Sequence, residues 1–168
     1  RFAARLSEWG VGHDTQVVVY DDAGGTYAGR MWWMLRWLGH DAVALLDGGI
    51  NAWEAAGYET SDAESKHPHA VFMPRLRPDM AVDVRFVESQ SARDGVRLLD
   101  ARNPQRFRGE NETLDPVGGH IPGAVNRFFK DNLQADGRFK PAQALRAEFD
   151  ALGLEPARTV HQCGSGVT

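Results

Sequence analysis

The chain has 168 residues, of which 42% are hydrophobic and 25% charged, a composition typical of globular chains that bury a core in one or two domains. Its net charge of −4 provides no basic surface for nucleic acid, and no apolar run approaches the roughly 20 residues that a membrane helix needs. The single cysteine excludes an internal disulfide and a zinc site built on several cysteines, and it fits a reducing compartment such as the cytoplasm.

The first third of the chain alternates between short β-branched runs and amphipathic stretches. Trp33 and Trp37 add a second apolar flank to one of these stretches, so we expect that helix to be well buried. Alternation of this kind predicts an open α/β sheet with parallel strands. In chain order, the predicted elements are a helix over 2–9, a strand over 17–20, a helix over 27–38, a strand over 42–46 and a helix over 50–57.

Residues 60–79 are rich in Ser, Asp, Glu, Lys, His and Pro and show no sustained period, which predicts a linker between two units. His67 and His69 lie in this stretch, and we interpret them as solvated linker residues rather than as part of a metal site. The second unit is predicted to contain a helix over 82–89, a strand over 96–100, a polar, turn-rich stretch over 103–119, a helix over 142–152 and a strand over 159–162.

The last predicted strand leads directly to Cys163, and Gly164, Ser165 and Gly166 follow it. A strand fixes the position of the sulfur, and the glycines allow backbone N–H groups to converge on a negative charge. A lone cysteine is more commonly a small buried hydrophobe, but a structural cysteine gains nothing from such a loop. Loop amides that stabilise a thiolate would make this thiol reactive, so Cys163 is predicted to be a nucleophile.

A similar pattern occurs earlier in the chain. Residues 17–22 followed by two glycines correspond to residues 158–163 followed by Gly-Ser-Gly, and the correspondence sets Asp22 against Cys163. This internal repeat predicts two copies of one fold, with a thiol in the second copy only.

Four segments share their order and spacing with a known family. They are Leu46-Asp47-Gly48-Gly49 with Trp53, Leu99-Asp100-Ala101-Arg102 with Arg106-Phe107-Arg108-Gly109, Gly119-His120-Ile121-Pro122-Gly123-Ala124 with Asn126, and Cys163-Gly164-Ser165-Gly166-Val167-Thr168. Together they resemble the tandem-domain rhodanese family of sulfurtransferases.

The resemblance implies an α/β fold with two rhodanese-like domains, each an open, mainly parallel sheet flanked by helices. It implies that residues 1–59 are the C-terminal part of an inactive domain, that 60–79 are the interdomain linker, and that 80–168 are a catalytic domain that stops after the active-site loop. Both domains are then incomplete in this chain. Asp22 cannot carry sulfane sulfur and repels anionic donors, which fits an inactive first domain.

The resemblance also implies a reaction. Cys163 takes a sulfane sulfur from a small anionic donor, thiosulfate or 3-mercaptopyruvate, and passes it from a persulfide to cyanide or a thiol acceptor. No metal or other cofactor is expected, and the protein is expected to be a cytoplasmic monomer without nucleic-acid or membrane partners. The residues expected to bind the donor are Arg106, Gly164, Ser165, Gly166, Val167 and Thr168.

Other polar residues of the motifs are expected to have structural roles. Arg102 is expected to pair with a structural carboxylate, Arg108 to lie at the surface, and His120 to belong to a structural turn. Members that prefer 3-mercaptopyruvate carry a further arginine between the Arg-Phe segment and the Gly-His-Ile-Pro segment, whereas residues 110–118 contain none. The choice between the two donors therefore stays open.

Two alternative functions also remain. A cysteine-dependent phosphatase uses the same type of thiolate loop, but it needs an arginine six residues after the cysteine, a position beyond Thr168. The other alternative is a non-catalytic rhodanese-like module that binds or carries sulfur. The presence of both Cys163 and Arg106 favours catalysis over this module.

Overall fold

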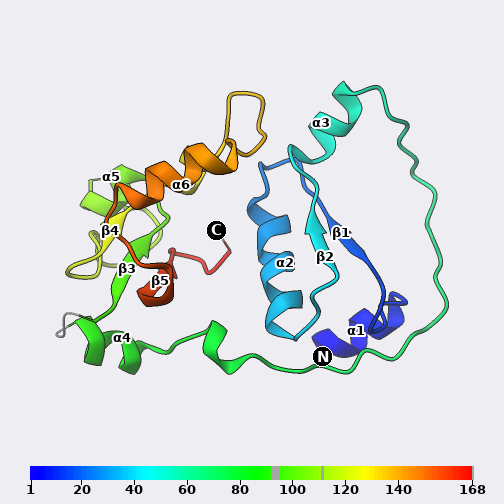
Figure 1. Ribbon diagram of the computed structural model, residues 1–168, viewed down its shortest axis with the longest axis horizontal. Coiled ribbons are helices and arrows are strands. Elements are labelled where there is room, and N and C mark those ends of the chain that lie inside the picture. Colours follow the sequence, from blue (N-terminus) through cyan, green and yellow to red (C-terminus); the bar gives the residue numbers. More distant parts are fainter. Residues whose placement is uncertain (92–94, 111, 168) are drawn as a thin grey trace. The chain divides into compact units, whose positions relative to one another are not determined.

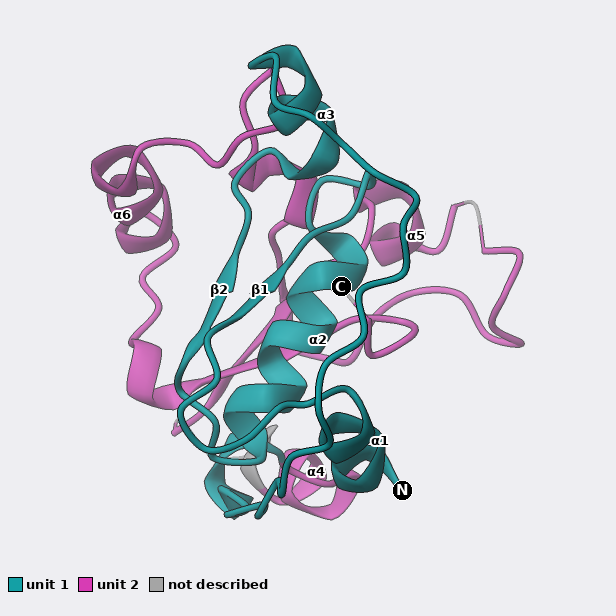
Figure 2. Ribbon diagram, turned by 90° about the vertical axis from the view of Figure 1, so that its right-hand side faces the viewer, with its two compact units in different colours: residues 1–81 teal, residues 82–168 magenta. Residues whose placement is uncertain are grey.

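The computed structural model describes residues 1–91, 95–110 and 112–167, and the chain forms two compact units, residues 1–81 and 82–168 (Figures 1 and 2). Unit 1 contains a two-stranded sheet, and unit 2 contains a three-stranded sheet. All three ladders between the named strands are parallel, which confirms the predicted open α/β architecture. No helix in the described part of the chain is long and apolar enough to span a membrane.

Unit 1 is built on β1 (Val17–Val19) and β2 (Val43–Leu45), which α2 (Thr26–Trp37) connects. α1 (Phe2–Glu8) precedes the sheet, and α3 (Gly49–Ala55) follows it (Figure 1). The short β-branched strands suit a sheet that packs against helices. The buried core of this unit consists of Leu6, Val11, Val19, Ala28, Leu35, Leu38, Val43 and Phe72.

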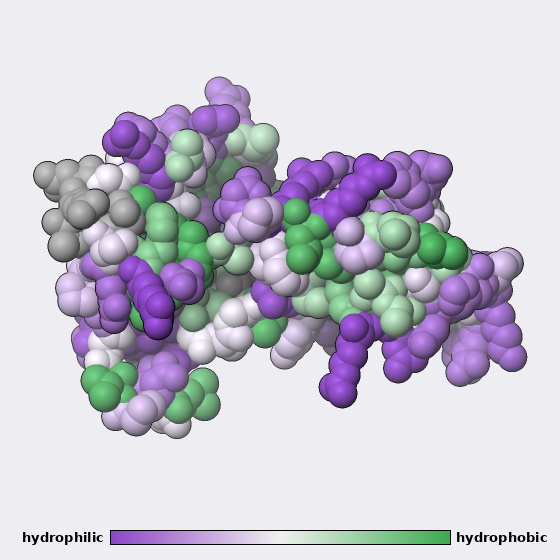
Figure 3. Space-filling model, turned by 90° about the horizontal axis from the view of Figure 1, so that it is seen from below, coloured by the Kyte–Doolittle hydropathy of each residue, from purple (hydrophilic) through white to green (hydrophobic). Residues whose placement is uncertain are grey.

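The helix α2 is less buried than the sequence predicts. Within this helix only Ala28 and Leu35 are buried, while Trp32 remains 37% exposed. Trp33 and Trp37 stack on each other with ring centroids 5.6 Å apart, and both are half-buried. A two-stranded sheet can cover only one stripe of the helix, so the second apolar flank stays at the surface of its unit. Figure 3 shows that hydrophobic residues lie among hydrophilic ones on one face of the molecule.

Residues 58–77 form neither helix nor strand, but their second half packs on unit 1. Phe72 is buried in the core of the unit, and its N–H donates to Ser7 Oγ at 2.9 Å. The guanidinium of Arg77 forms two hydrogen bonds with the Asp41 carboxylate, at 2.9 and 2.6 Å. The part of this stretch around Phe72 and Arg77 therefore belongs physically to unit 1, because an apolar anchor and an ion pair hold it there.

The central strand of unit 2 is β3 (Arg97–Asp100), which pairs with β4 (Val125–Asn126) and β5 (Thr159–Gln162). Asp100 is in register with both Asn126 and Gln162. The carboxyl ends of the three strands therefore meet at one edge of the sheet. Two helices, α4 (Val84–Ser91) and α6 (Ala142–Asp150), and short 3₁₀ turns at Phe129–Asn132 and Pro156–Arg158 complete most of the unit.

The helix α5 (Pro104–Arg108) lies in the stretch that the sequence predicted to be turn-rich. Its start has two recognisable signals, because Asn103 Oδ1 accepts the Gln105 N–H at 2.8 Å and Pro104 occupies the first turn. Five residues are too few for a helical period to show in the sequence. The predicted turn-rich stretch therefore contains a short helix that the sequence analysis did not identify.

The glycine at position 49 provides a test of the packing in unit 1. Gly49 has a φ of +60°, and a Cβ built on it would lie 2.1 Å from the Asp21 carbonyl oxygen. Gly57 has a φ of +79°, but a Cβ there would meet nothing within 4 Å. We predict that Gly49→Ala lowers the free energy of unfolding by about 1–3 kcal/mol more than Gly57→Ala does, because both variants carry backbone strain and only the first also forces two segments apart.

Urea unfolding of both variants, followed by circular dichroism, measures this difference. Equal losses of stability in the two variants would contradict the expected clash between a Cβ at position 49 and the Asp21 carbonyl oxygen.

Candidate active site

The predicted site residues of unit 2 gather at the carboxyl edge of its sheet. β3 ends at Asp100 and leads to α5, which carries Arg106, whereas β5 ends at Gln162 and leads to Cys163. The Ala101 N–H donates to the Gln162 carbonyl at 2.9 Å, which holds the two connections together as they leave the sheet. This edge is where open α/β sheets bind ligands.

The half-buried Cys163 lies in a turn that brings a backbone amide to its sulfur. The Gly166 N–H donates to Sγ at 3.0 Å, and Gly166 has the left-handed φ of +69° that favours glycine. Ser165 Oγ lies 3.8 Å from the same sulfur and accepts the Val167 N–H at 3.3 Å. This arrangement can stabilise negative charge on the sulfur. Thr168, the remaining residue expected in this loop, lies outside the described residues.

Gly164 lies close to the guanidinium of Arg106. A Cβ built on Gly164 would lie 3.2 Å from Nη2 and 3.3 Å from Nη1 of Arg106, and 3.4 Å from Cδ of Arg102. Gly164 is not among the glycines with positive φ, so the close approach of the two arginines, rather than backbone conformation, favours glycine here. The structure thus brings Arg106 next to the residue that follows Cys163.

Two carboxylates bind Arg106, and the sequence did not single out either of them. Nε and Nη2 of Arg106 donate to the two carboxylate oxygens of Glu112, each at 3.1 Å. Nη2 also donates to Oδ2 of Asp115 at 3.1 Å. Both carboxylates come from residues 110–118, between α5 and the Gly-His-Ile-Pro motif. The sequence analysis noted only that this segment contains no arginine.

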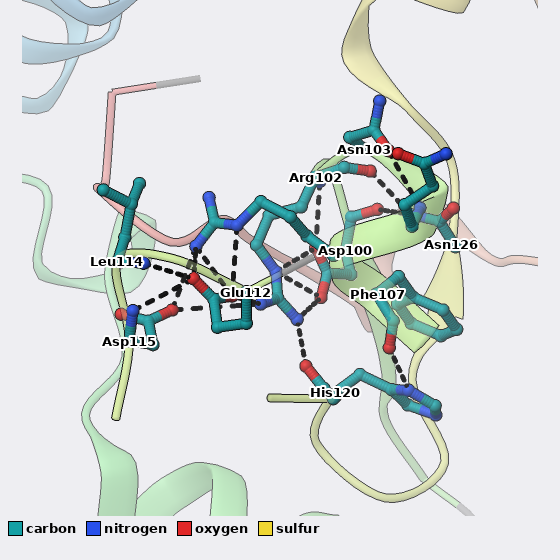
Figure 4. Close-up of polar contacts among 12 residues, drawn as sticks. Asp100, Arg102, Asn103, Phe107, Glu112, Leu114, Asp115, His120 and Asn126 are labelled. Atoms are coloured by element: carbon teal, nitrogen blue, oxygen red, sulfur yellow. Dashed lines mark hydrogen bonds and ion pairs between the residues drawn. The ribbon is translucent and has the colours of Figure 1, made fainter. Parts of the chain in front are cut away.

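Glu112 is almost fully buried, with 5% of its side chain exposed. Besides binding Arg106, its Oε1 accepts the backbone N–H groups of Leu114 at 2.8 Å and Asp115 at 3.0 Å (Figure 4). The Asp115 and Leu114 amides, followed by the Arg106 guanidinium, lower the pKa of Glu112 to about 2. Glu112 is therefore a fixed anion that orients Arg106.

Arg102 pairs with Asp100, which confirms the predicted structural pair. The Asp100 side chain is 0% exposed, and it accepts from Nε of Arg102 at 3.1 Å and from Nη2 at 2.8 Å. Nη2 also donates to the Gly119 carbonyl at 2.7 Å, and Nη1 lies 3.7 Å from Glu112 Oε2. Asn126 Nδ2 donates to the backbone carbonyls of Asp100 and Arg102, so it holds the start of this connection (Figure 4).

His120 and Arg108 have the structural and surface roles that the sequence analysis expected. The His120 ring hydrogen-bonds through Nδ1 to the Phe107 carbonyl at 2.7 Å and stacks on the Phe107 ring with centroids 3.7 Å apart. These contacts join the Gly-His-Ile-Pro turn to α5 (Figure 4). Arg108 is exposed and pairs with the exposed Glu110 at 2.7 Å.

The loop after β1 contains an anion of its own. The sequence analysis set Asp22 against Cys163, but Asp22 is exposed, and the neighbouring Asp21 is the residue that the loop amides bind. Burial raises the pKa of Asp21, but four backbone hydrogen bonds outweigh this effect and lower it overall. At distances of 2.8 to 2.9 Å, the Asp21 carboxylate accepts the N–H groups of Ala23, Gly25, Tyr27 and Ala28.

A pocket of about 410 Å³ opens beside α6 in unit 2, and it is separate from the Cys163 loop. Its lining includes none of the predicted site residues and is mostly apolar, with Leu99, Leu145, Phe149 and Leu154 among the residues that form it. In the described parts of the chain, no three His, Cys, Asp or Glu side chains are grouped so that they could hold a metal ion. The candidate site is therefore the sheet edge with Cys163 and Arg106.

Known proteins are similar to this chain over nearly its whole length. Residues 2–56 match the family model of the rhodanese-like domain. The chain is 47% identical to the probable 3-mercaptopyruvate sulfurtransferase of Pseudomonas aeruginosa, in an alignment that covers 99% of the chain and 60% of that relative. The crystal structure of SseA from Escherichia coli, described as showing the rhodanese fold of 3-mercaptopyruvate sulfotransferases, superposes with a TM-score of 0.85 and 33% identity and covers 99% of this chain and 63% of that one. Residues 2–56 therefore match a rhodanese-like domain, and the chain as a whole is similar to proteins with the rhodanese fold.

Other relatives bear the names of both types of sulfurtransferase. The chain is 37% identical to the 3-mercaptopyruvate sulfurtransferase of Homo sapiens and 35% identical to the thiosulfate sulfurtransferase of Bos taurus, and each alignment covers 99% of the chain. These alignments cover 58% of each of the two relatives, so the chain spans less than two thirds of their length.

The low pKa of Glu112 predicts that the chain loses stability in acid. The carboxyl titrates near its ordinary value of 4.5 in the unfolded chain and at about 2 in the folded one. Its contribution is therefore complete above about pH 5 and is lost as the pH falls from 4.5 towards 2. We predict that the difference in unfolding free energy between wild type and Glu112→Gln shrinks steadily as the pH falls through this range.

Urea unfolding at a series of pH values measures this difference. Glu155→Gln is the control, because it removes an exposed carboxylate whose partner Arg158 lies 3.7 Å away. A difference for Glu112→Gln that does not change between about pH 7 and pH 3 would show that the charge of Glu112 does not stabilise the fold.

Proposed function

We propose that this chain carries the catalytic loop of a sulfurtransferase that uses Cys163 as its nucleophile. The observation that carries the proposal is the position of the cysteine. Its sulfur accepts an amide N–H, and a Cβ built on the next residue, Gly164, would lie 3.2 Å from the guanidinium of Arg106. The names of the relatives support sulfur transfer over phosphate-ester hydrolysis and over a non-catalytic module.

In the proposed first half-reaction, the Cys163 thiolate attacks the sulfane sulfur of thiosulfate or the thiol sulfur of 3-mercaptopyruvate. A new S–S bond forms on Cys163, and the donor's S–S or C–S bond breaks. Sulfite leaves thiosulfate with the bonding electron pair, whereas the carbon of 3-mercaptopyruvate takes that pair and the thiol proton to give pyruvate. The outer sulfur of the persulfide is anionic, and the Gly166 N–H is positioned to stabilise charge in this loop.

In the second half-reaction, cyanide or a thiolate attacks the outer sulfur of the persulfide. The S–S bond breaks, its electron pair returns to Cys163, and thiocyanate or a new persulfide leaves. Donor and acceptor use the same loop in turn, which is the pattern of covalent catalysis. No group other than the cysteine carries the sulfur between the two steps.

Arg106 is proposed to hold the anionic group of the donor, because a guanidinium binds carboxylate and sulfonate-type oxygens through paired N–H groups. Gly164 allows the donor to approach this guanidinium, and Ser165, Gly166, Val167 and Thr168 complete the proposed binding loop. Residues 80–168 are assigned to the catalytic domain, 60–79 to the interdomain linker and 1–59 to an inactive domain. The protein is proposed to act as a monomer in the cytoplasm.

The nucleophile can be tested directly. We predict that the full-length protein produces thiocyanate from cyanide with thiosulfate or 3-mercaptopyruvate as the donor, and that Cys163→Ser loses this activity with both donors, because a hydroxyl cannot carry the sulfane sulfur. A colorimetric thiocyanate assay provides the measurement, and circular dichroism confirms that the variant is folded. Activity in Cys163→Ser equal to that of the wild type would remove the persulfide from the mechanism.

Arg106 can be tested against a neighbouring arginine. We predict that Arg106→Gln raises the donor KM by about tenfold or more, because a charge-assisted hydrogen bond to the donor is lost, and that kcat changes less. Arg108→Gln is the matched control, since Arg108 lies in the same helix but is exposed and pairs with Glu110. Steady-state kinetics with varied donor provide the measurement, and an identical donor dependence in both variants would argue against a binding role for Arg106.

A further inference from the structure

The two carboxylates on Arg106 differ in how firmly the protein holds them. Glu112 has 5% of its side chain exposed and accepts two backbone amides, as described above. Asp115 has 41% of its side chain exposed, and within the described residues its carboxylate reaches only Arg106, at 3.1 Å, and Arg102, at 4.0 Å. Glu112 is therefore a fixed partner of Arg106, whereas Asp115 is exposed enough to be exchanged for another anion.

The nitrogen atoms of Arg106 show where another anion would bind. Nε and Nη2 donate hydrogen bonds to Glu112, and the second hydrogen of Nη2 is donated to Asp115. Nη1 donates to no acceptor in the described part of the chain, and it faces Gly164, where a built Cβ would lie 3.3 Å away. An anion that binds Nη1 and Nη2 together must therefore replace Asp115 on Nη2.

The charges of the cluster agree with this exchange. Two guanidinium groups, Arg102 and Arg106, lie among three carboxylates. The two buried carboxylates, Asp100 and Glu112, already balance the two arginines. Asp115 therefore contributes an excess negative charge at the outer side of the cluster, and this charge repels an anion that approaches the Cys163 loop.

We propose that Asp115 is a specificity-determining residue that competes with the anionic group of the sulfur donor for Arg106. Its carboxylate weakens the binding of every anion at this site, and it yields to anions that engage both Nη1 and Nη2. Glu112 acts through Arg106 as a positioning residue and does not exchange. The identity of the donor rests on the proposed sulfurtransferase function, but the competition for Arg106 can be measured without it.

The test uses the alkylation of Cys163 in the full-length protein by anionic iodoacetate and by neutral iodoacetamide. The rates are followed by mass spectrometry of the peptide that contains Cys163. We predict that Asp115→Asn raises the ratio of the iodoacetate rate to the iodoacetamide rate by about twofold to fivefold, because a partly exposed ion pair no longer competes with the reagent's carboxylate. The neutral reagent corrects for any change in the reactivity or exposure of the thiol.

Glu110→Gln is the matched control, because it removes the same charge from the same segment but from a carboxylate that binds Arg108. The ratio in this variant is expected to stay within the error of the wild-type value. An unchanged ratio in Asp115→Asn, or an equal rise in both variants, would overturn the proposed competition.

A kinetic measurement separates this inference from the proposed function. Asp115→Asn is expected to lower the KM for thiosulfate by a factor similar to the rise in the alkylation ratio, whereas Glu110→Gln leaves it unchanged. If the wild-type protein transfers no sulfur, the proposed function is overturned. The alkylation ratio still supports or overturns the role of Asp115 in that case, because alkylation requires only a thiolate and a nearby guanidinium.

Discussion

The buried ion pair between Asp100 and Arg102 fixes the edge of the sheet on which the candidate site lies. A carboxylate with no solvent exposure is stable only if a partner satisfies its charge and its hydrogen bonds, and Arg102 does so from two residues away. The same guanidinium binds the Gly119 carbonyl, so the pair ties the end of β3 to the segment that precedes β4. A Cβ built on Gly164 would lie 3.2 Å from Arg106 and 3.4 Å from Arg102, so the Cys163 loop passes close to this pair.

The loops after β1 and β5 use their backbone amides to bind different negatively charged groups. In the first, four amides bind the Asp21 carboxylate, which is a permanent part of the chain. In the second, an amide N–H points at the sulfur of Cys163, whose charge would change during the proposed reaction. A loop whose amides are already occupied has none to offer to an incoming anion. This contrast is consistent with the proposal that only the second loop is catalytic.

Local sequence patterns predicted the parallel strands and the longer helices, because β-branched runs and apolar periodicity are properties of a few adjacent residues. The same patterns missed α5, which is too short to show a period, and they did not single out Asp21, whose carboxylate the amides of the first loop bind. The partners of Arg106 were also missed, because Glu112 and Asp115 reach it through an irregular segment that no periodicity describes. Cys163 and Arg106 were found as residue types in motifs, and only the structure supplies the contact of Gly164 with the guanidinium.

The three carboxylates that pair with Arg102 and Arg106 differ in burial, and this difference separates fixed charges from exchangeable ones. Exposure of the carboxylate side chains rises from 0% at Asp100 to 5% at Glu112 and 41% at Asp115. Removing the partner of a buried charge leaves that charge without compensation, whereas an exposed charge that loses its partner is hydrated again at little cost. The two inner carboxylates can therefore hold the arginines in place through a catalytic cycle. The outer carboxylate can leave Arg106 when an anion arrives, so the adjustable part of the site lies on the side from which a donor would approach.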